Sequence, residues 1–266
     1  MGNAVSAAAG QSDLLTIEQS GTVLKVGLNR PAKRNALNDG IILAIQDCFA
    51  QLPDGVGAVV IHGIGDHFSS GPDLSELTEH DATEGLRHSQ MWHRVFDRIQ
   101  YSRVPVIAAL KGAVIGGGLE LACAAHIRVA EPSAYFALPE GQRGIFVGGG
   151  GSVRLPRLIG VARMTDMMLT GRVYSATEGS AYGFAQYLTE PGGGLPKAME
   201  LAERISANAP LTNFAVLQAL PMIAEANPQT GLLMESLMAT VAQSDKEAKR
   251  RIREFLEHKT AKVKPT

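Results

Sequence analysis

The stretch VIAALKGAVIGGGLELACAAHIRVAE, residues 106–131, contains the pattern that decides the fold. Its first five residues are continuously apolar, which is typical of a strand buried on both faces of a parallel sheet. Three glycines at 116–118 lead into an apolar, helix-like segment, and Ile127–Ala130 has the composition of a returning strand. This order predicts an α/β fold whose parallel strands are joined by right-handed crossovers.

The same alternation of strands and helices continues on both sides of this stretch. Leu14–Gln19 and Val23–Leu28 alternate around a Ser20-Gly21 turn and predict a hairpin. Ala58–His62 predicts a second buried strand, and Ala134–Leu138 is expected to be extended. Helices are expected at Ile41–Leu52, Gly85–Ile99, Gly117–His126, Ser152–Ile159, Ala162–Leu169, Ala176–Tyr182, Leu195–Ala207, Thr212–Ala224, Gly231–Val241 and Ser244–Lys259.

The distribution of these signals predicts three parts of the chain. Residues 1–12 are rich in small residues and are expected to form a flexible tail. From about Ala162 onward no strong strand signal appears. We therefore expect an α/β core over 13–190 and a helical C-terminal region over 191–266, with the seam at the glycine-rich PGGG of 191–194.

Composition excludes several classes of function. The chain has 266 residues and a formal net charge of −1, so no global basic field would hold nucleic acid or an acidic membrane. No apolar run reaches the roughly 18 residues of a transmembrane helix, and a cytoplasmic location is expected. Cys48 and Cys123 lie in apolar windows and are interpreted as reduced core residues. Gly2 and Ser6 match a short myristoylation pattern, for which a plain small-residue tail is the alternative.

The segment GGGLE at 116–120 is a candidate site for an anionic oxygen. Glycine lets the backbone approach a ligand, and the first N–H groups of a helix have no internal partner. Gly117 would present such an N–H group, with Glu120 one turn inside the helix. A tightly packed turn with a solvated Glu120 is the alternative interpretation.

Glu140 follows Glu120 by twenty residues, with one helix and one strand pair between them. A ten-residue helix spans about 15 Å, and a short strand covers a similar length, so the chain can return to where it began. Two carboxylates in one pocket can divide acid and base roles if their pKa values differ. A loop-tip carboxylate in water is the alternative for Glu140. Phe68–Leu74 forms another glycine turn, at the sheet edge where α/β folds bind ligands.

These segments together resemble the crotonase superfamily, the enoyl-CoA hydratases and isomerases. The matching segments are NRPAKRNAL at 29–37, FSSGPDL at 68–74, the opening stretch at 106–131, FALPEGQRGIFVGGGG at 136–151 and LTGRVYSATEGSAYGFAQYL at 169–188. The resemblance implies a spiral of ββα units with a C-terminal helical trimerisation region, in a homotrimer or a dimer of trimers. It also implies an acyl-CoA thioester substrate, no cofactor beyond the coenzyme A of the substrate, no metal, no membrane and no nucleic-acid partner.

Carried over by resemblance, Gly117 is the oxyanion glycine and Glu120 and Glu140 are the two catalytic carboxylates of a hydratase in fatty acid metabolism. The family's second oxyanion donor is the amide after the motif glycine, and here that residue is Pro72, which has no N–H. Three explanations are open for how the enolate is stabilised without this N–H. The first is that Gly117 and the helix dipole suffice. The second is that the Ser70 hydroxyl or the Asp73 amide takes over as donor. The third is that the enzyme catalyses a reaction that needs less enolate stabilisation. The sequence favours compensation.

The resemblance also maps the substrate contacts. Ala32, Lys33, Arg34 and Ala36 resemble the loop along the nucleotide of coenzyme A, with Lys33 or Arg34 near phosphate. Asp73 and Leu74 resemble the turn that meets adenine and pantetheine. Trp92 and Phe146 are candidates for the acyl pocket, as are His88 and Met91. Phe255 and Lys259 resemble terminal-helix residues that approach coenzyme A, for which a solvated amphipathic face is the alternative.

Several functions remain open at this point. The leading hypothesis is hydration of a short or medium 2-enoyl-CoA. Within the same fold, isomerisation of an enoyl-CoA is an alternative, as is hydration with thioester hydrolysis of a substituted acryloyl-CoA such as methylthioacryloyl-CoA. A non-catalytic, RNA-associated homologue is disfavoured by the balanced charge. A dinucleotide-dependent oxidoreductase is disfavoured because GAVIGGG lacks the G-x-G-x-x-G spacing.

Overall fold

The computed structural model describes residues 13–73, 75 and 81–257. The chain divides into two compact units, the first ending at Ser206 and the second beginning at Ala207. The expected tail over residues 1–12, with its myristoylation pattern, lies outside the described residues. No helix in the described part of the chain is long and apolar enough to cross a membrane.

The first unit begins with the expected hairpin. Strand β1 (Leu15–Ser20) pairs antiparallel with β2 (Val23–Leu28), and Ser20 stands opposite Val23. The connecting turn is Gly21-Thr22, one residue later than expected, and Gly21 takes a φ of +57° that favours glycine.

The main sheet has six strands in the order β1-β2-β3-β4-β6-β9. Strands β2, β3, β4, β6 and β9 run parallel, as the buried apolar runs predict, and only the β1 edge is antiparallel. A smaller sheet has the order β5-β7-β8. The bounds are β3 (Ala58–Gly63), β4 (Val106–Leu110), β5 (Ala113–Ile115), β6 (Ile127–Ala130), β7 (Tyr135–Ala137), β8 (Tyr174–Ser175) and β9 (Tyr187–Leu188).

Two of these strands correct the expectation that strand structure ends near Ala162. Strands β8 and β9 have two residues each, too few to show a period in the sequence. They form because β7 and β6 offer paired edges to which a short extended segment can add.

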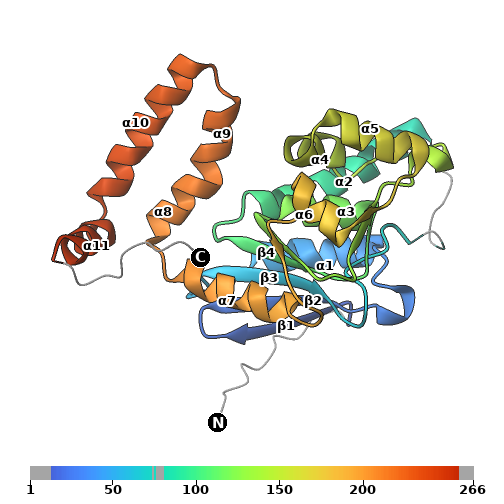
Figure 1. Cartoon of the computed structure of the whole chain (residues 1–266), viewed down its shortest axis with the longest axis horizontal. Helices are drawn as coiled ribbons and strands as arrows, with labels where there is room; N and C mark the ends of the chain where they lie inside the picture. The colour runs from blue at the N-terminus through green and yellow to red at the C-terminus, as the bar shows by residue number, and fades with distance from the viewer. Residues whose placement is uncertain (1–12, 74, 76–80, 258–266) are drawn as a thin grey trace, which may run out of the picture. The chain divides into compact units, whose positions relative to one another are not determined.

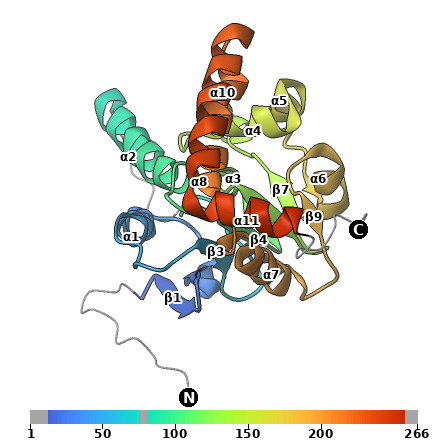
Figure 2. The same ribbon diagram turned by 90° about the vertical axis from the view of Figure 1, so that its left-hand side faces the viewer.

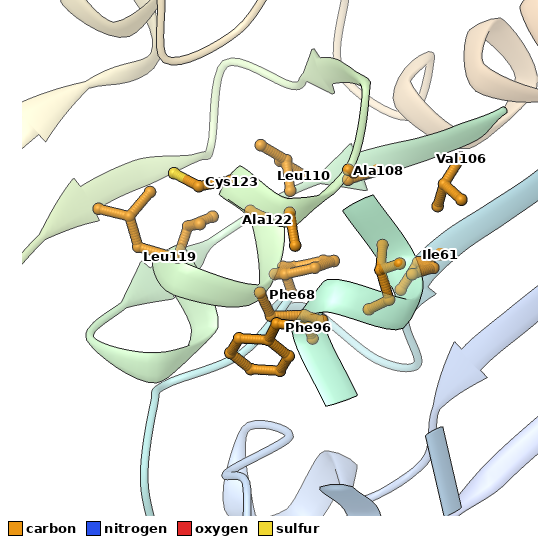
Figure 3. Packing of buried hydrophobic residues seen from close by; sticks show 14 of the residues in the cluster. Ile61, Phe68, Phe96, Val106, Ala108, Leu110, Leu119, Ala122 and Cys123 are labelled. Carbon is orange, nitrogen blue, oxygen red and sulfur yellow. The ribbon is translucent and has the colours of Figure 1, made fainter. Parts of the chain in front are cut away.

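The two faces of the sheet carry separate hydrophobic clusters. Val59 and Ile61 of β3 belong to one cluster, whereas Ala58 and Val60 belong to the other, because alternate residues of a strand point to opposite faces. Helix α3 lies in the first cluster. Figure 3 shows its Leu119 and Ala122 among the side chains of this cluster, which also includes Phe68 and Phe96.

The first unit contains these helices: η1 (Pro31–Lys33), α1 (Asp39–Ala50), α2 (Ala82–Gln100), α3 (Gly117–Ala124), η2 (Gly141–Arg143), α4 (Gly151–Ile159), α5 (Val161–Thr170), α6 (Ala176–Tyr182) and α7 (Gly194–Ser206). Asn38 caps α1 by accepting a hydrogen bond from the Ile41 amide. Asp81 and Glu84 form a capping box at the start of α2. All eight residues of α3 are buried, as its almost uncharged sequence predicts.

Helix α7 belongs to the first unit, so the boundary lies after Ser206 and not at the glycine-rich 191–194. Its Ala198, Leu201 and Ala202 pack with Val60 and Ile107 in the second cluster. Figures 1 and 2 show α7 along the strands of the main sheet. The burial of one apolar face of α7 joins it to the core in spite of the glycines before it.

The second unit is entirely helical in its described residues. It comprises α8 (Pro210–Phe214), a π-helical segment η3 (Ala215–Ala219), α9 (Leu220–Glu225), α10 (Pro228–Ser244) and α11 (Lys246–Leu256). The expected helix over Thr212–Ala224 therefore contains a π segment that ends two residues before Pro221, which has no N–H for the regular ladder. Figure 1 shows α10 folded back beside α9.

Candidate active site

A cavity of about 430 Å³ lies between the 29–37 loop, the 70–75 turn, the end of β5 and η2. It unites seven residues expected to contact the substrate, either at its coenzyme A part or at the oxyanion turn: Ala32, Lys33, Arg34, Ala36, Ser70, Pro72 and Asp73. Ser75, Ile115 and Arg143 also line the cavity and were not identified from the sequence. Arg143 had a sequence signal, because it follows Glu140 by three residues in the same loop.

A buried asparagine holds the loop that forms one wall of this cavity. Asn35 is fully buried; its Oδ1 accepts from the Arg30 amide at 2.9 Å, and its Nδ2 donates to the carbonyls of Ile64 and His67. Arg34 and Asn35 both have φ values above +50°, a left-handed conformation that costs energy outside glycine. The hydrogen bonds of Asn35 offset this strain and place Arg34 at the cavity wall.

Asp73 fixes the opposite wall. Its carboxylate accepts from Arg30 at 2.7 Å, from Lys33 at 3.0 Å and from the Ser75 hydroxyl at 2.6 Å. The Ser75 hydroxyl, together with Lys33 and Arg30, holds the pKa of Asp73 well below its ordinary value. Asp73 is thus a buried anion that positions Lys33 at the cavity.

The glycine turn at 116–118 lies next to this cavity, directly after Ile115. A Cβ at Gly117 would lie 2.7 Å from Cζ3 of Trp92, and a Cβ at Gly116 would lie 2.6 Å from Oε1 of Glu140. Both glycines are therefore required by close packing as well as by the turn, where Gly116 has a φ of +53°. Gly117 begins α3, so its N–H has no acceptor within the helix.

Glu120 is 3 % exposed and is held by the start of another helix. Its Oε1 accepts from the amides of Gly149 at 2.9 Å and Gly151 at 2.7 Å, where α4 begins. Burial raises the pKa of the Glu120 carboxyl, and the two amides oppose this shift by stabilising the anion.

Glu140 is also buried, with its Oε1 against Gly116. Its Oε2 has no hydrogen-bond partner among the residues that the structure describes. Burial and, to a smaller extent, the nearby charge of Glu120 together raise the pKa of Glu140 to about 7, against the opposing effect of Arg143. The structure thus brings both carboxylates to the turn that carries Gly117, in two different electrostatic environments.

Pro72 occupies the side of this site that faces Gly117. The Leu37 amide donates to the Gly71 carbonyl and the Asp73 amide donates to the Leu37 carbonyl, both at 2.8 Å. In such a bridge the nitrogen of the middle residue points away from the partner strand. The Pro72 Cδ, bonded to that nitrogen, lies 3.4 Å from the Cβ position of Gly117. A methylene group therefore stands where an N–H would point.

The other residues that the sequence predicted at the substrate site lie in different places. Trp92 is buried against Gly117, and its Nε1 lacks a partner within the described ranges. Phe146 is 68 % exposed and does not line the described cavity. Phe255 is exposed in the second unit. Leu74 and Lys259 lie outside the described residues. No group of three or more metal-binding side chains occurs in residues 13–73, 75 and 81–257.

Comparison with known proteins identifies the family. Residues 18–265 match the sequence model described as enoyl-CoA hydratase/isomerase. The chain belongs to this family. Its membership confirms the crotonase-like α/β fold that the sequence predicts, with helices at the C-terminal end. The family acts on acyl-CoA thioesters and includes both hydratases and isomerases.

Three relatives show how far the similarity extends. A short-chain-enoyl-CoA hydratase of Clostridium acetobutylicum is 33 % identical over 83 % of this chain and 85 % of its own length. A 2,3-dehydroadipyl-CoA hydratase of Escherichia coli is 32 % identical over 94 % of this chain and 98 % of its own length. A structure has been solved of a protein from Rhodopseudomonas palustris that is provisionally named as an enoyl-CoA hydratase. It is 76 % identical over 97 % of this chain and 100 % of its own, with a TM-score of 0.92.

Proposed function

We propose that this enzyme adds water across the double bond of a short or medium 2-enoyl-CoA. The observation that carries the proposal is the meeting of two buried carboxylates, Glu120 and Glu140, at the turn that presents the Gly117 amide. Coenzyme A enters as part of the substrate, and no separate cofactor is needed for this reaction.

The chemistry follows from the different environments of the two carboxylates. The Gly117 amide donates to the thioester oxygen and stabilises the enolate that develops there. Glu120, whose anionic form is favoured by two amides, takes a proton from water while the water oxygen bonds to Cβ. The π electrons of the double bond move to the enolate, and Cα takes a proton from Glu140. A pKa of about 7 keeps a large share of Glu140 protonated at neutral pH, as this step requires.

The cavity supplies a matching place for the nucleotide part of coenzyme A. Lys33 and Arg34 line it and would meet phosphate groups, with Lys33 oriented by Asp73. Asp73→Asn is expected to act mainly on substrate binding, because the Asp73 carboxylate accepts from Arg30, Lys33 and Ser75 and so orients Lys33 at the cavity.

A panel of acyl-CoA thioesters tests the proposed reaction. Hydration of crotonyl-CoA and hexenoyl-CoA removes the absorbance of the conjugated thioester, and we expect this loss without release of free thiol. Thiol release would favour hydrolysis after hydration of a substituted acryloyl-CoA. Conversion of a 3-enoyl-CoA to the conjugated 2-enoyl-CoA, with no water addition to any member of the panel, would show an isomerase instead.

Arg154 is expected to position the turn that holds Glu120. Its guanidinium is buried, donates to the Gly149 carbonyl at 3.0 Å, and is fixed by Asp97 and Gln100 of α2 at 2.6 Å each. Its charge also lowers the pKa of Glu120. Arg154→Met should therefore lower kcat about tenfold or more and move the acidic limb of the kcat/KM profile to higher pH, because Glu120 must lose its proton to act as a base.

The pH profile separates this role from simple stabilisation. Arg154→Lys keeps the positive charge, so the acidic limb should return towards that of the wild type even if kcat is not fully restored. A lower rate with an unchanged pH profile in the folded Met variant would contradict the positioning role.

We further propose that the second unit joins copies of the chain in a homotrimer or a dimer of trimers. Its helices expose large apolar side chains that a monomer would leave in water. The side chains that are more than half exposed include Leu220, Met222, Leu232, Leu233, Leu237 and Phe255.

A further inference from the structure

Residues 69–73, in the turn opposite Gly117, have no free backbone donor to offer a substrate. The amides of Ser69, Ser70, Gly71 and Asp73 all donate within the protein. Their acceptors are, in that order, the Ala113 carbonyl, the Arg34 carbonyl, the Ser69 hydroxyl and the Leu37 carbonyl. Pro72, the one residue of 69–73 whose nitrogen points towards Gly117, has no N–H.

These contacts also remove the substitutes that the sequence suggested. The Asp73 amide is held by Leu37 at 2.8 Å, and the Ser70 hydroxyl donates to the Lys33 carbonyl at 3.4 Å. A hydroxyl has a single hydrogen, and a backbone amide held at 2.8 Å is not free to turn. The Asp73 amide is therefore not available, and the Ser70 hydroxyl would have to leave the Lys33 carbonyl before it could donate to a substrate.

We propose that Pro72 sets the catalytic rate of this enzyme by making one side of the oxyanion site apolar, so that the thioester oxygen is stabilised from the α3 side alone. The inference rests on the proposed function. It implies that the turn is already shaped for a second donor: Gly71 approaches Gly117 so closely that a Cβ on Gly71 would lie 3.4 Å from the Gly117 nitrogen. The turn lacks only the N–H hydrogen that a residue other than proline would have at position 72.

The structure also indicates that an amide can be introduced without moving the turn. The two bonds that flank Pro72, from Leu37 to Gly71 and from Asp73 to Leu37, do not involve the proline ring. In Pro72→Ala the new N–H would point along the direction that Cδ now takes, towards Gly116 and Gly117. A preorganised donor directed at a developing oxyanion is worth on the order of 10²-fold in kcat.

The experiment compares crotonyl-CoA hydration by the wild type, Pro72→Ala and Pro72→Gly. Both variants should raise kcat by about tenfold or more with little change in KM, because the donor acts on the enolate more than on the bound substrate. Pro53→Ala, which removes a proline from an exposed loop, is the matched control and should leave the rate unchanged.

A spectroscopic readout distinguishes the donor from a general effect on the loop. Acetoacetyl-CoA, a β-keto thioester, forms an enolate that absorbs in the near ultraviolet, and a second donor should lower the pH at which the bound ligand ionises. An active wild type with Pro72 variants that are no faster, and that ionise acetoacetyl-CoA at the same pH, would overturn the inference. A wild type that hydrates no enoyl-CoA would instead overturn the proposed function, while the acetoacetyl-CoA titration would still test the donor.

Discussion

Glu120→Gln and Glu140→Gln should each lower kcat for hydration of crotonyl-CoA by about 10²-fold to 10⁴-fold, the usual contribution of a positioned acid or base. Glutamine is close in shape to glutamate but cannot exchange a proton at neutral pH. Glu120→Gln keeps an oxygen for the amides of Gly149 and Gly151, so the glycine turn should persist. The loss would then report chemistry, measured as the decrease in enoyl-thioester absorbance.

The double variant and a surface control complete this test. If the two carboxylates act in one step, the kcat of the double variant should be only slightly lower than that of the less active single variant. Glu200→Gln removes an exposed carboxylate that pairs with Lys197 on α7, and it should retain the wild-type rate. Full activity in either single variant would show that the reaction does not need two carboxylates.

Glu140→Gln should also stabilise the folded protein at alkaline pH. Burial gives Glu140 a folded pKa of about 7 against an ordinary value of 4.5. Between these values the folded state keeps a proton that the unfolded state releases, so stability falls as pH rises through this window. The loss reaches about 3 kcal/mol above pH 7, at 1.36 kcal/mol for each pKa unit. Glutamine carries no charge and avoids it.

Denaturant unfolding at pH 5 and pH 8 measures this effect. The variant and the wild type should differ little at pH 5, whereas the variant should be more stable at pH 8. Burial lowers the pKa of His62 and His126, so both destabilise the folded state as the pH falls below about 6.5. Both histidines are present in the wild type and in the variant, so their effects on the free energy of unfolding cancel in the comparison. An equal difference at both pH values would mean that Glu140 is not buried as an acid.

Short-range patterns predicted most of the fold correctly. The hairpin, the buried strands β3 and β4, and helices α1 and α2 were found within a few residues of their bounds. Each depends on a local feature, such as a glycine turn, a continuous apolar run or a capping residue. Strands β8 and β9 could not be found in this way, because a two-residue strand exists only through the edge of its partner.

The same division applies to the site. The sequence indicated Glu120, Glu140 and Gly117, and it showed that residue 72 has no N–H. It did not indicate that the amides of Gly149 and Gly151 would hold Glu120, that Glu140 would keep an unpaired oxygen among the described residues, or that Leu37 would take the amide of Asp73.

The sequence by itself determined the hairpin, the longer buried strands, most of the helices, the family of the chain, and the absence of a donor at Pro72. Only the tertiary structure decided the hydrogen-bond partners and the burial of the two carboxylates, and with them their pKa values. Backbone conformation depends largely on residues within a few positions along the chain. Hydrogen bonding and desolvation depend on atoms such as those of Glu120 and Gly151, thirty-one residues apart, which meet only when the chain packs.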